Sequence, residues 1–497
     1  MDAPARPRFR EAAAVVLVRG EGASLETYWV RRSDAVGYFA GFHAFLGGKT
    51  DPADLELPLE NAAGLPELER VMRACAIRES FEEAGVLVGL AAPADPAALP
   101  AARDRLLGGH DAFPALAREH GWRFDAGSIE FCGRWTTPPF AAQRFDTMFF
   151  LARVPEGQQA GVVPGELESG EWIRPAAALA RYRRAEARFA APTLAILEAL
   201  GAGGPDMVAR MIAAPAALAE PVRRIELTWG VVLHPMKTKP LPPATHTNAY
   251  LVGEREMALI DPGSGEADEI ESLFRLLDLL GSEGRELRLI LATHAHPDHI
   301  GGIEAVRRRT GAKVVAHADT AKAVHADLVV KDGDWLPLVP GESGDWNLRV
   351  LHTPGHARGH LCILHARTRS LFTGDHIPGG QGTVIIDPPE GDMTAYLASL
   401  ERLLEEPVDW LFPAHGSPQG GAKRRIRALI EHRLGRERKV LAVLGADPQT
   451  PVQLLPEAYA DVKPELWPYA ERSLMAHLLK LEGEGRAVRE GERWRLA

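Results

Sequence analysis

The sequence predicts a multidomain protein that combines α/β and α+β folds, and three observations support this prediction. The chain has 497 residues, which is more than one hydrophobic core can organise, so we expect several domains. Between residues 224 and 420, strand-like apolar runs alternate with helical segments, as in α/β layered folds. After residue 420 the chain becomes helix-rich and ends in a hairpin pattern.

The first expected domain spans residues 1–202. A helical segment at 66–84 and a closing helix at 192–200 accompany its strands. The strand patterns lie at residues 13–18, 26–30, 129–135 and 145–154. Gly201-Ala-Gly-Gly-Pro205 then interrupts the pattern, and the following residues are rich in Ala, Pro and Gly, so we expect a linker at 203–223.

Two further domains are expected after the linker. The second, at 224–420, begins with a strand at 225–233 and contains a helix at 267–280. The third, at 421–497, has three helical segments and a hairpin with its turn near Glu490-Gly491, which together predict a winged helix. This tail carries a net charge of +4, with its basic residues concentrated in its first helix: Lys423, Arg424, Arg425, Arg427, Arg433, Arg436, Arg438 and Lys439.

Charge, cysteine content and hydropathy indicate which kinds of protein this chain can be. The net charge of −10 argues against a protein that coats nucleic acid along its whole length. The three cysteines show no paired spacing, which predicts a reducing compartment and three small buried hydrophobic side chains. The sequence has no signal-peptide pattern and no apolar stretch long enough to span a bilayer, so we expect a cytoplasmic protein without a membrane partner.

A cluster of metal-ligand residue types follows the apolar run at 287–292. His294, His296, Asp298 and His299 lie within six residues, where the chain leaves a strand and turns toward a helix. Alternate strand residues share a face, so His294 and His296 project to the same side. Imidazole and carboxylate groups suit zinc, iron or manganese. A single histidine at a strand end is usually an ordinary surface residue, but no packing or turn requirement explains this pattern.

Three later donors stand in the same kind of position. His356, Asp375 and His415 each follow a short strand-like run that breaks at a small residue. Loops on one edge of a sheet can direct such side chains toward a common point. The seven residues therefore predict one centre with enough ligands for two metal ions.

The segment 224–420 resembles the metallo-β-lactamase superfamily of hydrolases. His246-Thr-Asn248-Ala-Tyr-Leu and Leu259-Ile-Asp261-Pro-Gly are similar to its early strands, and all seven ligand positions are filled. The resemblance implies an αββα sandwich that holds two Zn²⁺, or Fe or Mn. His294, His296 and His356 would bind one ion, Asp298, His299 and His415 the other, and Asp375 would bridge them. We take Asp298 as a candidate catalytic residue too.

The substrate is left open between two classes. The pattern is similar to the glyoxalase II and ribonuclease Z branches, and a winged-helix tail resembles the subgroup that includes the mitochondrial endoribonuclease of this fold. Since basic residues suit a phosphate backbone, we expect phosphodiester or RNA hydrolysis with nucleic-acid contact through the tail. The alternatives are a solvated charged helix and a thioester hydrolase of the glyoxalase II type. The sequence leaves the oligomeric state open.

A second constellation lies on the helical segment 66–84. Glu79, Glu82 and Glu83 stand at i, i+3 and i+4, so they share a face, and their mutual repulsion would be relieved by a hard cation such as Mg²⁺. The alternative is an ordinary charged helix face.

The stretch Arg78-Glu-Ser-Phe-Glu-Glu83-Ala-Gly resembles the second half of the Nudix box, and Phe45-Leu-Gly47-Gly48 resembles a motif of coenzyme A diphosphatases. The resemblance implies a Nudix α/β/α sandwich in which the three glutamates bind Mg²⁺ or Mn²⁺ and act on a nucleoside-diphosphate-linked substrate. Ser80, Gly37 and Leu46 depart from these motifs, and an insertion interrupts the first half of the box. A non-catalytic ligand-binding Nudix module is therefore the alternative.

Overall fold

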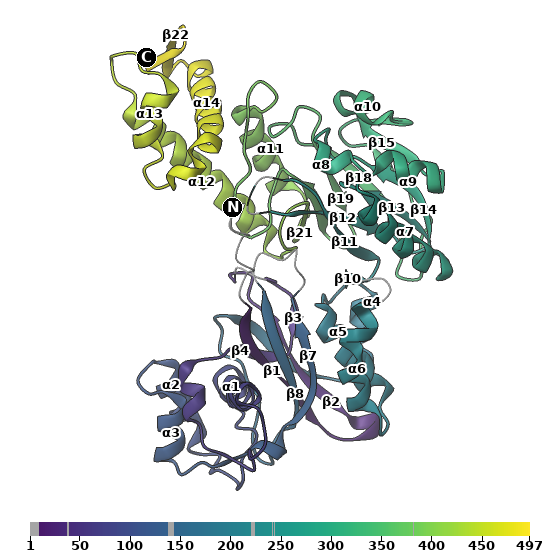
Figure 1. Cartoon of the computed structure of the whole chain (residues 1–497), viewed down its shortest axis with the longest axis vertical. Coiled ribbons are helices and arrows are strands. Elements are labelled where there is room, and N and C mark those ends of the chain that lie inside the picture. The colour runs from purple at the N-terminus through teal and green to yellow at the C-terminus, as the bar shows by residue number, and fades with distance from the viewer. Residues whose placement is uncertain are drawn as a thin grey trace. The chain divides into compact units, whose positions relative to one another are not determined.

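The computed structural model describes residues 9–36, 39–137, 144–219, 224–240, 242, 244–380 and 382–497. Gly37, one of the motif departures, lies outside these ranges. The chain divides into two compact units, Met1–Trp229 and Gly230–Ala497. Figure 1 labels the elements of both.

Unit 1 is built on a mixed sheet. Its strands lie in the order β3-β2-β1-β8-β7, with β4 paired to β1 and β9 paired to β2. The strands are β1 (Arg10–Arg19), β2 (Glu26–Arg32), β3 (His43–Ala44), β4 (Leu46–Lys49), β7 (Glu130–Thr136), β8 (Phe145–Arg153) and β9 (Leu167–Ile173). A two-stranded pair is formed by β5 (Leu59–Glu60) and β6 (Phe124–Asp125).

Strand β1 divides the interior of unit 1 into two cores. Val15 and Leu17 pack in one core, whereas Val16 and Val18 pack in the other, because successive strand residues face opposite sides. Helices α1 (Glu67–Ala84), α2 (Leu99–Leu107) and α3 (Phe113–Glu119) contribute to the first core, and α4 (Pro175–Arg183), α5 (Ala191–Ala202) and α6 (Met207–Ala219) to the second. With helices on both faces of the sheet (Figure 1), the expected α/β/α sandwich is confirmed.

The stretch expected to be a linker, 203–223, is mostly helical in its described part. Helix α6 lies within it, and the fully buried Met211 packs into the second core of unit 1. The many alanines that suggested an irregular linker are strong helix formers, and Pro215 is the only proline inside the helix. Most of this stretch therefore belongs to the first unit.

Besides the two-stranded hairpin of its tail, the described part of unit 2 contains two larger sheets. One has the order β11-β12-β13-β14-β15-β16, and the other has the order β17-β18-β19-β20-β21. The first comprises β11 (Val231–Lys237), β12 (His246–Val252), β13 (Glu256–Ile260), β14 (Glu286–Leu291), β15 (Lys313–His317) and β16 (Leu328–Val330). The second comprises β17 (Trp335–Leu336), β18 (Leu348–His352), β19 (Leu361–His365), β20 (Ser370–Gly374) and β21 (Trp410–Pro413).

The two sheets of unit 2 pack face to face, and helices cover them. The ring of Tyr250 on β12 lies 5.3 Å from Phe372 on β20 and 5.7 Å from Phe412 on β21. Helices α7 (Ala267–Ser282) and α9 (Ile303–Thr310) pack on the first sheet, and α11 (Met393–Glu405) packs on the second. Short helices α8 (Pro297–Ile300) and α10 (Ala318–Val324) complete the expected αββα sandwich.

The strand expected at 225–233 is two strands. Strand β10 (Ile225–Thr228) ends before Trp229, and β11 begins after Gly230. Gly230 has φ of +77°, a conformation that glycine adopts without strain, so a turn separates two runs that read as one in the sequence.

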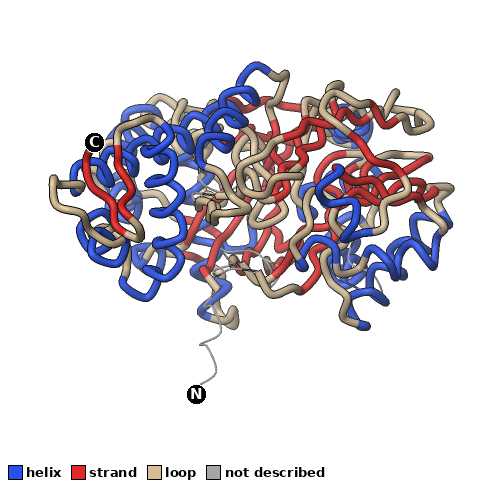
Figure 2. Tube along the Cα trace, turned by 90° about the horizontal axis from the view of Figure 1, so that it is seen from above, coloured by secondary structure: helices blue, strands red, loops and turns tan. Residues whose placement is uncertain are grey.

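The tail forms the predicted winged helix. It comprises α12 (Ala422–Val443), α13 (Pro451–Ala458), α14 (Trp467–Gly483), β22 (Ala487–Glu490) and β23 (Arg493–Leu496). Figure 2 shows the two strands of the hairpin beside the tail helices at the C-terminus. Trp494 on β23 is fully buried among residues of all three helices. Among the described residues, no helix has the length and apolar character needed to cross a bilayer.

Candidate metal centre

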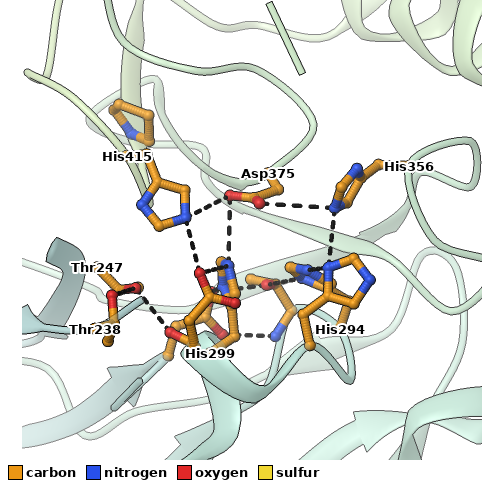
Figure 3. A network of polar contacts seen from close by, with 12 residues as sticks. Thr238, Thr247, His294, His299, His356, Asp375 and His415 are labelled. Carbon is orange, nitrogen blue, oxygen red and sulfur yellow. Dashed lines mark hydrogen bonds and ion pairs between the residues drawn. The ribbon is translucent and has the colours of Figure 1, made fainter. Parts of the chain in front are cut away.

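Seven imidazole and carboxylate side chains converge in unit 2, each placed beyond the end of a strand. Figure 3 labels five of them: His294, His299, His356, Asp375 and His415. Strand β14 leads into Thr293–His299, and β18 leads into the loop that carries His356. Asp375 follows β20 directly, and His415 follows β21. The structure therefore brings together all seven residues expected from the sequence: His294, His296, Asp298, His299, His356, Asp375 and His415.

The first group consists of three histidines and Asp375, whose potential ligand atoms lie within 4.8 Å of one another. Nδ1 of His296 is 2.9 Å from Nε2 of His294 and 3.2 Å from Nε2 of His356. Oδ2 of Asp375 is 3.6 Å from Nε2 of His356. Three ring nitrogens and one carboxylate oxygen thus surround a single point.

The second group consists of Asp298, His299 and His415, whose potential ligand atoms also lie within 4.8 Å of one another. Oδ2 of Asp298 lies 3.4 Å from Nε2 of His415 and 3.9 Å from Nε2 of His299. Oδ1 of Asp375 approaches the same two nitrogens, at 3.3 and 3.4 Å respectively. Asp375 therefore presents one oxygen to each group, and Figure 3 shows it between His415 and His356.

Four of the histidines are held by their outward-facing Nδ1 atoms. Nδ1 of His299 lies 2.8 Å from Oδ2 of Asp261, and Nδ1 of His294 lies 3.0 Å from Oγ1 of Thr293. Backbone carbonyls hold the other two: His356 donates to Ile385 O and His415 to His246 O, both at 2.9 Å. Each of these contacts leaves Nε2 directed into the cluster, as in metal sites where an outer partner fixes the ligand tautomer.

His296 has the opposite orientation. Its Nδ1 faces the cluster, and its Nε2 lies 3.7 Å from a carboxylate oxygen of Glu390. His296 is also the more exposed member of the first group, with 35% of its side chain accessible, whereas His294 is fully buried. The cluster is therefore open to solvent on the side of His296 and Glu390.

Burial and neighbouring charges together shift the pKa values of the cluster. Burial disfavours the charged form of His299, yet the carboxylates of Asp375 and Asp261 raise its pKa well above the ordinary value. Burial, reinforced by the neighbouring His299 and His356, lowers the pKa of His294 well below its usual range. For Asp375 burial is outweighed by His415 and His299, which hold its pKa well below normal. These pKa shifts favour the ionised form of Asp375, the charged form of His299 and the neutral form of His294.

This donor set fits divalent metal ions. The buried Nε2 atoms of His299 and His415 make no hydrogen bond within the described chain, and an unsatisfied buried polar atom is costly. In the first group, ring nitrogens face one another, and a cation bound between them would relieve the repulsion between their lone pairs. Five imidazoles and two carboxylates are nitrogen and oxygen donors of the kind that zinc, iron and manganese accept.

The glutamates expected to bind a cation in unit 1 lie on α1. The guanidinium of Arg78 contacts Glu79 and Glu82, both at 2.7 Å, and Asp54 at 2.8 Å. The backbone N–H of Gly47 donates to Glu83 Oε2 at 2.7 Å. A Cβ atom at Gly48 would lie 2.3 Å from a carboxylate oxygen of Glu79, so a side chain at this position would displace that carboxylate.

Burial dominates the titration of these carboxylates. It raises the pKa of Glu79 to about 7, with Arg78 opposing and Glu82 reinforcing the shift, and raises the pKa of Glu83 well above normal. Within the described residues, the three glutamates do not bring three ligand atoms within 4.8 Å. Arg78 takes the place that a cation would occupy between Glu79 and Glu82, so a bound ion would have to displace or share this contact.

Some residues around both centres were not assigned roles from the sequence. Asp261 follows β13 in the same way that Asp375 follows β20, and that pattern could have identified it. No comparable sequence pattern identifies His360, although its buried ring accepts a hydrogen bond from the backbone N–H of Asp375 at 3.2 Å. Asp54, 3% exposed beside Arg78, also has no local signature.

Three segments of the chain match known protein families. Residues 242–415 match the model of the Metallo-beta-lactamase superfamily. Residues 450–494 match the Beta-lactamase associated winged helix domain, and residues 59–200 match the NUDT19 Nudix domain.

Individual relatives match parts of the chain. The Beta-lactamase-like protein 2 homolog of Drosophila melanogaster is 31% identical over 251 residues, which cover 48% of this chain and 83% of the fly protein. The Atrochrysone carboxyl ACP thioesterase of Claviceps purpurea (strain 20.1) is 31% identical over 200 residues, which cover 40% of this chain and 60% of that enzyme. A NUDIX hydrolase from Alicyclobacillus acidocaldarius aligns with 39% of this chain and 92% of its own, with 30% identity and a TM-score of 0.36.

Proposed function

The chain belongs to the metallo-beta-lactamase superfamily, and a Nudix domain precedes that fold in the sequence. We propose that unit 2 hydrolyses thioesters at a dinuclear metal centre. The observation that carries the proposal is the position of Asp375, which presents one oxygen to each of two groups of histidines. A relative at 31% identity is named as a thioesterase, which supports this substrate class.

Two of the basic residues in the first tail helix weaken the argument for an RNA substrate. Arg433 and Arg436 are 3% and 7% exposed, and they bind the carbonyl of Val384 and the carboxylate of Asp461. Arg438 and Lys439 also have carboxylate partners within the tail. Arg433 and Arg436 are therefore too buried to contact a phosphate backbone, whereas Arg438 and Lys439 keep exposed side chains. Nucleic-acid binding by the tail stays a prediction.

The residues of the centre suit attack by water on a carbonyl group. When bound, a pair of divalent cations lowers the pKa of water and stabilises the negative charge that builds on the attacked oxygen. His294, His296 and His356 would hold one cation, and Asp298, His299 and His415 the other. Oδ2 of Asp298 is the atom that approaches both histidines of its group. We assign its Oδ1 the role of accepting a proton as water attacks, after which the C–S bond breaks and the thiolate leaves.

For unit 1 we propose cleavage of a diphosphate bond in a coenzyme A-type compound. The match to a Nudix domain and the glutamates on α1 support this assignment. Glu79, Glu82 and Glu83 would hold Mg²⁺ or Mn²⁺. An acyl-coenzyme A contains both a thioester and a diphosphate, so the two units would act on two bonds of one class of molecule.

A substrate panel tests the proposal on the purified full-length chain. Zinc-loaded protein would be assayed against acyl-coenzyme A thioesters, S-lactoylglutathione and single-stranded RNA. We expect thiol release from at least one thioester and no RNA cleavage. RNA cleavage without thioester hydrolysis would overturn the proposed substrate class and restore the phosphodiester alternative.

A further inference from the structure

A loop of unit 2, residues 382–391, runs beside the first group of ligands, and we call it the strap. Residues 382–390 belong to no helix or strand. The strap provides the carbonyl of Ile385, which accepts from Nδ1 of His356 at 2.9 Å, and the carboxylate of Glu390, 3.7 Å from Nε2 of His296. It therefore supplies the outer partners of two of the three histidines in this group.

The winged-helix tail holds the other side of the strap. Arg433 on α12 donates to the carbonyl of Val384, the residue next to Ile385. Arg425 on the same helix donates to Gly382 O, and Arg472 on α14 forms an ion pair with Asp387 at 3.0 Å. Because these arginines bind a segment without a strand partner, the tail sets the position of the strap.

Arg433 has a second route to the metal ligands. Its guanidinium carbon lies 5.4 Å from the ring centre of Tyr396, within the range of a cation–π contact. The Tyr396 hydroxyl donates to the carbonyl of His376 at 3.0 Å, and His376 follows Asp375 directly. Arg433 thus supports the backbone on both sides of the first group.

The two histidines of the second group are held by other elements. His299 is held by Asp261 at the end of β13, and His415 is held by the carbonyl of His246 on β12. Neither contact involves the strap or an arginine of the tail. Disturbing the tail should therefore affect the two metal positions unequally.

We propose that Arg433 is a positioning residue which, through the strap, sets the metal affinity of the position formed by His294, His296 and His356. In this arrangement the tail is a structural part of the metal centre rather than an appended substrate-binding module. The inference rests on the metal centre of the proposed function but not on its substrate.

Zinc titration of metal-free full-length protein, in competition with a chromophoric chelator, tests the proposal. We expect two equivalents for the wild type. In Arg433→Met one equivalent should keep its affinity, and the other should weaken by about tenfold, at the lower end of effects for outer-shell partners. Arg433→Lys keeps a donor and should recover part of the loss.

Arg436→Met is the matched control. Arg436 is a buried arginine of the same helix, but its partners are Asp461 and the carbonyl of Ala458, both within the tail. We expect this variant to bind two equivalents as the wild type does, even if its melting temperature falls. Thermal melts of the metal-free proteins would show whether each variant is folded.

Combining two substitutions shows which of the two metal positions is weakened in Arg433→Met. In His356→Ala the first position is already impaired, so adding Arg433→Met should cause little further loss, because the two changes act on one site. Unchanged zinc affinity in Arg433→Met, or equal weakening of both equivalents, would overturn the inference. A wild type that binds fewer than two equivalents would overturn the metal centre of the proposed function and the inference with it.

Discussion

The carboxylate of Asp261 lies 2.8 Å from Nδ1 of His299, and both side chains are almost completely buried. The same carboxylate accepts from the backbone N–H and the hydroxyl of Thr293, at 2.8 and 2.7 Å. Asp261 therefore fixes both the ring of His299 and the turn that leads into His294. It adopts a φ of +50°, unusual for a residue other than glycine, at the start of the loop that follows β13.

Asp261→Asn should weaken zinc binding at the position formed by Asp298, His299 and His415. Asparagine keeps the shape but removes the charge that favours the hydrogen-bonded His299 ring, and loss of such a partner typically costs 10–100-fold in metal affinity. A chelator-competition titration would measure this, with one equivalent expected to keep its affinity. Asp278→Asn, which removes an exposed carboxylate paired with Arg309, serves as the control. Unchanged affinity of both equivalents would contradict the assigned role of Asp261.

Asp375→Ala should remove activity while the fold is kept. Asp375 is the residue that faces both groups, so its loss removes an oxygen donor from each metal position and the negative charge between them. We expect hydrolysis at background level and fewer than two zinc equivalents by elemental analysis. Circular dichroism of the metal-free variant would verify the fold. Retained hydrolysis with two bound equivalents would rule out the bridging position.

The clustering of the seven side chains could be predicted from the sequence because each of them follows a strand end. This relation is local: a strand run, a small residue and then a donor, as at Thr373-Gly-Asp375. The fold followed from the same alternation of strands and helices. Where local pattern conflicted with tertiary structure the prediction was wrong, as for α6, whose alanines favour a packed helix over a linker.

The outer partners of the ligands could not be predicted in this way. Ile385 O, His246 O and Glu390 contact the histidines only because the fold places them there. Their residue types do not identify them as partners of the histidines. The basic tail shows the same limit. Arg433 and Arg436 suggested a nucleic-acid surface because charge is visible in a sequence, whereas burial and internal partners are not.

Glu83→Gln should abolish the metal-dependent activity of the Nudix domain. Glu83 is half-buried, its Oε2 accepts from the backbone N–H of Gly47, and the remaining carboxylate charge is what would attract a cation. The assay measures Mg²⁺-dependent cleavage of coenzyme A in full-length protein that also carries Asp375→Ala, which silences the second centre. Glu67→Gln, an exposed position in the first turn of the same helix, should leave the rate unchanged. Absence of activity in the parent protein would instead support a ligand-binding Nudix module.

His477→Leu should reduce the loss of stability in acid. His477 on α14 is fully buried, and neither ring nitrogen has a hydrogen-bond partner within the described chain. Burial, together with the nearby Arg433 and Lys480, lowers its pKa to about 3, whereas an unfolded histidine titrates near 6.5. The folded protein therefore holds a neutral ring while the unfolded chain binds a proton. The stability contributed by the neutral ring is fully present above about pH 6.5 and is lost as the pH falls toward 3.

In this window one such histidine contributes a slope of about 1.4 kcal/mol per pH unit to the free energy of unfolding. Guanidinium unfolding of the metal-free wild type and of His477→Leu between pH 7 and pH 4 would measure the difference between their slopes. The metal ligands titrate in both proteins, so their contribution cancels in that difference. His110→Leu replaces an exposed histidine and should leave the slope of the wild type unchanged. Parallel slopes for the wild type and His477→Leu would show that His477 is protonated, or accessible to solvent, in the folded tail.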